Sequence, residues 1–104
     1  DISKKFRAIL YFGTIITILW ATSVKISINR GIKNYEIGNY KLSIKYLNYS
    51  TKMYPNKIGR HYVLLADAYF GIGDTLNAKR YAKIAQEINP NHHSVKQLLD
   101  KISK

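Results

Sequence analysis

The first quarter of the chain carries one continuous apolar segment. Between Arg7 and Lys25 there are 17 residues without a charge, residues 8–24. As a helix this segment would be about 25 Å long, at the short end of the range for a transmembrane span. Its apolar residues surround the helix on all sides, and Trp20 lies near its end, where interfacial aromatic residues are enriched. The pattern predicts a single-pass membrane anchor over residues 1–24.

Two other interpretations of this segment stay open. Residues 4–7 and 21–23 resemble the basic start and the small-residue cleavage site of a secretory signal. The second alternative is an ordinary buried helix, which would need a large partner surface to cover it on all sides. Basic residues flank both ends of the segment, so orientation depends on the short basic start, which favours a cytoplasmic N-terminus with the remainder outside. Because the chain begins with Asp1 instead of Met, we expect further residues before it.

The remainder of the chain repeats itself at an offset of 35 residues. Gly38 aligns with Gly73, and each Gly can adopt the left-handed conformation that ends a helix. Pro55 aligns with Pro90, and proline cannot continue a helical hydrogen-bond ladder. The other aligned pairs include Asn39 and Asp74, Ser43 and Ala78, Lys45 and Arg80, Tyr46 and Tyr81, Ser50 and Ala85, Met53 and Ile88, and Asn56 and Asn91. Each unit is therefore predicted to be a helical hairpin whose second helix starts at Asn39 or Asp74 and uses small residues for close packing.

These units resemble the tetratricopeptide repeat, a 34-residue helix–turn–helix family. The second unit carries the family signature at Leu65, Ala66, Tyr69, Gly73, Asp74, Ala78, Ala85 and Pro90. The first unit keeps Gly31, Gly38, Tyr40 and Pro55 but has Arg30, Asn34, Ser43 and Ser50 where the family has other residues. An extra residue near Ile58 lengthens the spacing. The resemblance implies an all-α fold with repeats over 25–57 and 58–92 and a capping helix over 93–104.

Stacked repeats of this family resemble one another in holding a peptide or helix in a concave groove. The resemblance places candidate groove residues at Lys25, Ile28, Ile32, Tyr35, Glu36, Arg60, Val63, Asp67 and Phe70. The alternative is that Ile28, Tyr35, Val63 and Phe70 simply pack between helices. The family's carboxylate clamp needs Lys and Asn where this chain has Ile28 and Ile32, so that activity is not expected.

Catalytic and metal-binding chemistry finds little support in the sequence. There is no Cys, and His61, His92 and His93 lack a cluster of carboxylates beside them. Residues 71–74 (Gly-Ile-Gly-Asp) fit a turn between helices better than a phosphate-binding loop, because a third Gly and a following Lys are missing. We therefore expect no enzyme activity, no cofactor, no metal and no small-molecule substrate.

The charge balance bears on partners. The chain has 17 Lys and Arg against 6 Asp and Glu, a formal net charge of +11. The basic residues are scattered, and beside a membrane anchor the negative surface of lipid headgroups is a simpler partner than nucleic acid, which is not expected. The sequence predicts a non-catalytic, membrane-anchored scaffold, an accessory or assembly subunit that binds integral membrane proteins of a larger complex. The alternative is a peptide-binding adaptor that recruits soluble clients through the groove.

Overall fold

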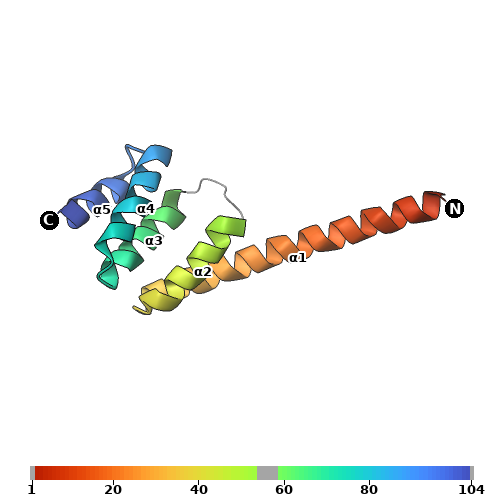
Figure 1. Ribbon diagram of the computed structural model, residues 1–104, viewed down its shortest axis with the longest axis horizontal. Coiled ribbons are helices and arrows are strands. Elements are labelled where there is room, and N and C mark those ends of the chain that lie inside the picture. The colour runs from red at the N-terminus through yellow and green to blue at the C-terminus, as the bar shows by residue number, and fades with distance from the viewer. Residues whose placement is uncertain (1, 54–58, 104) are drawn as a thin grey trace.

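The computed structural model describes residues 2–53 and 59–103, and the prediction of an all-α fold is confirmed. Within these ranges there is no β-strand. The chain runs from one long helix through four shorter ones, the last three of which lie together beside the end of the first (Figure 1). In order they are α1 (Ile2–Glu36), α2 (Tyr40–Met53), α3 (Gly59–Gly71), α4 (Thr75–Ile88) and α5 (His93–Ser103). Residues 54–58, which include Pro55 and the inserted position near Ile58, lie outside the described residues.

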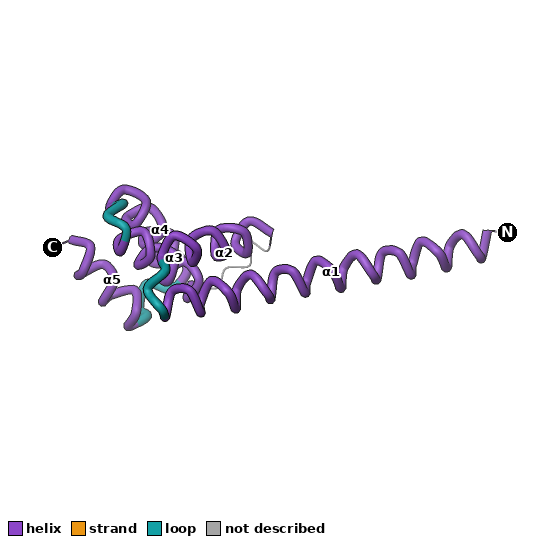
Figure 2. Tube along the Cα trace, turned by 90° about the horizontal axis from the view of Figure 1, so that it is seen from below, coloured by secondary structure: helices purple, strands orange, loops and turns teal. Residues whose placement is uncertain are grey.

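The N-terminal half of α1 stands apart from the other helices. Every side chain from Ile2 to Leu19 is exposed, and no other element lies beside this half in either view (Figures 1 and 2). The molecule is consequently elongated, 66 × 27 × 20 Å. Among the described residues α1 is the one helix long and apolar enough to cross a membrane, and only 6% of its most apolar window is buried within the chain.

Each hairpin has one turn between its two helices, and the two turns have the same geometry. Gly38 and Gly73 have φ values of +85° and +83°, the left-handed region that a residue without Cβ adopts readily. At the first turn the Asn39 amide donates to the Asn34 carbonyl at 2.8 Å, and the second turn repeats this bond five residues apart. This is the Schellman arrangement that satisfies the last carbonyls of a helix. The predicted helix ends at Gly38 and Gly73 are confirmed.

The first hairpin packs the C-terminal half of α1 against α2 through small residues. A Cβ added to Gly31 would lie 2.7 Å from the Leu47 Cγ, so the two backbones approach as closely as this glycine allows. Leu47 and Ser43 are fully buried, and the Ser43 hydroxyl donates to the Gly31 carbonyl at 2.8 Å. The small residues predicted on one face of α2 therefore do allow close packing.

The second hairpin and α5 form one hydrophobic cluster. Ala66 of α3 and Ala78 and Ala82 of α4 are fully buried, and Leu98 and Ile102 of α5 cover them. Asp74 starts α4, since its carboxylate accepts the Asn77 amide at 3.1 Å. The helix ends at Ile88, just ahead of Pro90, as the sequence predicts. The helix predicted after the second unit is present and shields the last apolar face.

A second cluster joins the two hairpins across α2 and α3. It contains Ile44 and Leu47 from α2 and Leu65 and Ala68 from α3. Beside it the Asn48 side chain donates a hydrogen bond to the Tyr69 hydroxyl at 3.0 Å and accepts one from the Tyr81 hydroxyl at 3.3 Å. The two tyrosine rings stack on each other with their centroids 5.4 Å apart. This contact ties α2 to both helices of the second hairpin.

Candidate functional site

One carboxylate links three helices on the candidate groove. Asp67 of α3 accepts a hydrogen bond from the Tyr35 hydroxyl of α1 through one oxygen. Its other oxygen accepts from the Lys101 ammonium of α5 at 2.6 Å. Burial and the hydrogen bond to Asp67 raise the pKa of the Tyr35 phenol, which lies well beyond the apolar segment of α1. Since both Asp67 oxygens have partners within the chain, this carboxylate fastens the helices together.

The aromatic candidates pack around the same bond network. The Lys101 ammonium lies 5.4 Å from the centre of the Phe70 ring, within the range of a cation–π interaction. Phe70 itself packs against the cluster of α3, α4 and α5. Tyr35 packs beside the α2–α3 cluster, with its ring 5.8 Å from that of Tyr40. Tyr35 and Phe70 therefore have packing roles in the fold, whatever else they contact.

The remaining α1 candidates belong to the first hairpin. Ile28 and Ile32 are half-buried, whereas Lys25 and Glu36 are exposed. None of these four has a polar contact with Asp67 or Lys101 among those the structure shows. Of the candidate groove residues, the structure brings Tyr35, Asp67 and Phe70 together. Tyr35 bonds Asp67 directly, and Lys101 contacts both Asp67 and Phe70.

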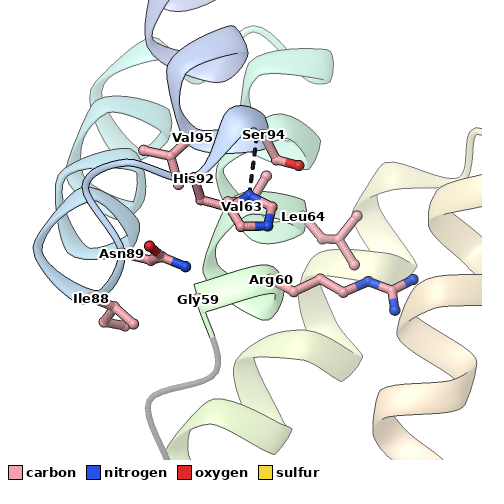
Figure 3. A pocket seen from close by; sticks show the side chains of 9 residues that line it. All are labelled: Gly59, Arg60, Val63, Leu64, Ile88, Asn89, His92, Ser94 and Val95. Carbon is pink, nitrogen blue, oxygen red and sulfur yellow. Dashed lines mark hydrogen bonds between the residues drawn. The ribbon is translucent and has the colours of Figure 1, made fainter.

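Arg60 and Val63 line a different feature, a pocket of about 390 Å³ at the start of α3 (Figure 3). Its other lining residues are Gly59, Leu64, Ile88, Asn89, His92, Ser94 and Val95. The Arg60 side chain extends away from Ile88 and Asn89 (Figure 3). The imidazole of His92 is held by the Ser94 amide, which donates to its Nδ1 at 3.2 Å. The pocket is mostly apolar, with one cation and one imidazole among its lining residues.

Sequence reasoning missed two residues that complete these contacts. The sequence places Lys101 in the capping helix and indicates no role for it, because nothing in the pattern of α5 pairs a lysine with a carboxylate 34 positions earlier. Asn48 likewise carries no sequence signal for an interhelical contact, although its amide joins Tyr69 and Tyr81. Their partners lie on other helices, so neither residue carries a local signal.

The titratable side chains that the structure describes were compared for metal-binding clusters and for shifted pKa values. Over residues 2–53 and 59–103 no three His, Asp or Glu side chains are placed to share a metal ion. Burial, with a smaller effect of the neighbouring Arg60 charge, lowers the pKa of His61 below its ordinary value.

A scan of this chain against protein-family models finds no match, and a search of curated proteins finds none either.

Proposed function

We propose that this chain is a non-catalytic, single-pass membrane scaffold built on two tetratricopeptide-like hairpins, an accessory or assembly subunit of a larger membrane protein complex. The observation that carries the proposal is the exposed apolar half of α1. Eighteen consecutive side chains, residues 2–19, lie outside the fold although most are apolar. Water would disfavour so large an apolar surface, and hydrocarbon would accept it.

The continuity of α1 supports a bracing role. The same helix leaves the apolar segment and becomes the first helix of the hairpin, ending only at Glu36. An α-helix is stiff over this length, so a partner that holds the span would also fix the direction of α2–α5. The N-terminus is proposed to be cytoplasmic, with α2–α5 on the other side of the membrane.

The contacts on the groove favour the scaffold over the adaptor. Asp67 is one of the candidate groove residues, and its oxygens already bind Tyr35 and Lys101. Phe70 is covered in part by the Lys101 ammonium. A client peptide would have to displace contacts that hold the helices together, which lowers its net binding free energy.

A substitution in the exposed span tests the scaffold directly. A Cβ at Gly13 would meet no atom of this chain within 4 Å, so Gly13→Leu leaves the fold itself intact. Small residues are where membrane helices approach each other most closely, and the added bulk should displace a neighbouring helix. We expect Gly13→Leu to lose most of the integral membrane proteins that co-purify with the wild-type chain.

The matched control is Ala8→Leu, which adds similar bulk about 140° away around the helix. It should retain the co-purifying proteins. A Tyr35→Ala/Phe70→Ala variant distinguishes the adaptor, which would lose soluble clients while keeping its membrane location. Co-purification of membrane proteins that is equally strong in wild type and Gly13→Leu would argue against helix packing at this face.

A further inference from the structure

The end of α2 lies beside the apolar segment of α1. Its contacts reach Trp20, ahead of residue 25, where the first repeat is predicted to begin. The Trp20 indole nitrogen donates to the Met53 carbonyl at 3.1 Å, and the Ser23 and Tyr49 hydroxyls lie 3.2 Å apart. Val24 is buried by the same packing, at 6% exposed. Met53 and Tyr49 therefore sit at the level of Trp20 and Ser23 along α1, inside the charge-free segment.

The length of α1 fixes where this level falls in a bilayer. The basic residues Lys4, Lys5 and Arg7 mark one boundary of the hydrocarbon core, because a cation inside the core is energetically costly and these side chains extend towards the headgroups. From Ile2 to Trp20 the helix rises only about 27 Å, and from Arg7 to Trp20 only about 20 Å. The hydrocarbon core is about 30 Å thick. The second boundary consequently falls at Trp20 or beyond it, and any tilt of α1 moves it further towards Val24.

From these two observations we infer that the C-terminal end of α2, residues 49–53, lies at the boundary between the hydrocarbon and the headgroups of the same bilayer that α1 crosses. The inference rests on the proposed membrane anchoring and adds a second lipid contact to it. The fold and the membrane would then touch along two antiparallel helices, and α2–α5 would be held at one orientation to the surface.

The side chains at this end suit that environment. Tyr49 and Met53 are 40% and 41% exposed, so a phenol and a thioether face outward beside Trp20. Aromatic residues with a polar tip are enriched at this depth, and the exposed Lys52 can extend its ammonium to lipid phosphates. The bond from Trp20 also satisfies the Met53 carbonyl, one of the helix-end groups that lack an intrahelical partner.

Spin labels on the full-length chain in vesicles of phosphatidylcholine and phosphatidylglycerol test the inference. The chain has no Cys, so Met53→Cys, Leu42→Cys and Ile16→Cys each give one labelling site. Leu42 is the matched control, since it is 39% exposed on the same helix and lies about 16 Å from Met53 along the axis. Ile16, 51% exposed, reports the anchor alone. Power saturation with oxygen and a water-soluble nickel chelate measures each label's access to lipid and to water.

We expect the ratio of oxygen to nickel accessibility to be severalfold higher at position 53 than at position 42, and highest at position 16. Equal ratios at 53 and 42 with a high ratio at 16 would overturn the inference while leaving the anchor in place. Low ratios at all three positions would overturn both the inference and the proposed membrane anchoring.

The wild-type chain provides a second measurement without any substitution. Trp20 is its only tryptophan, so the fluorescence comes from the junction with α2. Lipids brominated near the ester end of the acyl chain should quench it severalfold more than lipids brominated near the methyl end. The reverse order would place the end of α2 in the middle of the bilayer, and absence of quenching would place it in water. Either result overturns the inference.

Discussion

The contact between Gly31 and Leu47 sets how closely α1 and α2 approach, and it yields a quantitative prediction. A Cβ on Gly31 would lie 2.7 Å from the Leu47 Cγ and 2.8 Å from its Cδ2. Leu47 is fully buried, so it has no open space to move into. Overpacking of this kind costs about 2 kcal/mol. Replacing a helical glycine by alanine returns about 1 kcal/mol through helix propensity. Gly31→Ala should therefore destabilise the fold by about 1 kcal/mol.

The double substitution separates the clash from every other effect. Leu47→Ala alone should cost about 3 kcal/mol through lost burial and a cavity. In Gly31→Ala/Leu47→Ala the clashing atoms are gone, so only the propensity gain remains and the loss should be about 2 kcal/mol. Independent effects would instead give a loss of about 4 kcal/mol. The predicted coupling is thus about 2 kcal/mol in favour of the double variant.

Urea unfolding of the full-length chain in a mild non-ionic detergent measures these values. Far-ultraviolet circular dichroism follows the helices, and Trp20 fluorescence follows the separation of α2 from α1. Gly13→Ala is the control for helix propensity, because its Cβ meets no atom of the chain within 4 Å and it should therefore show no loss of stability and a gain of at most about 1 kcal/mol. A Gly31→Ala variant at least as stable as wild type, with energies that add to those of Leu47→Ala, would refute the packing described for this hairpin.

Three further predictions use the same urea titration. Asp67→Asn should lower the free energy of unfolding by about 1 kcal/mol, because the ion pair with Lys101 is partly exposed and an amide binds the Lys101 ammonium less strongly than a carboxylate does. This loss should shrink in high salt, and an unchanged unfolding midpoint would exclude a role of the pair in the fold. Gly73→Ala should lose about 1–2 kcal/mol, since φ at this position is +83° and a Cβ disfavours it; unaltered stability would contradict the left-handed turn. Burial depresses the pKa of His61, so its stabilising effect is present above pH 6.5 and is lost as the pH falls through the lowered pKa; His61→Gln should flatten the decline in stability on acidification, and a slope equal to that of wild type would count against this burial.

The helices and turns could be predicted because their causes are local. Gly38 and Gly73 are needed where the backbone turns left-handed, and Asp74 is needed to cap the following helix. The small residues Ser43 and Ala78 are recognisable because the two helices of a hairpin are close in sequence. These features recur at a fixed offset, which makes them visible without any structure.

The polar contacts between helices could not be predicted, because each depends on a register that several distant contacts decide together. Asp67 finds Lys101 only after α5 has packed against the alanines of α3 and α4. Trp20 reaches Met53 only because the packing of α1 against α2 sets how far α2 extends along it. The candidate groove, taken from the resemblance alone, accordingly contained Tyr35, Asp67 and Phe70 but lacked the lysine that joins them.

We propose that this chain is a membrane-embedded subunit of a larger assembly, and quantitative co-purification tests this proposal most directly. The full-length chain is purified from its native membrane in mild detergent, and the accompanying proteins are identified and their stoichiometry measured. The account predicts a fixed-stoichiometry set of integral membrane proteins that survives moderate salt. A chain that purifies alone as a detergent monomer, or with a salt-sensitive, substoichiometric mixture of soluble proteins, would contradict it.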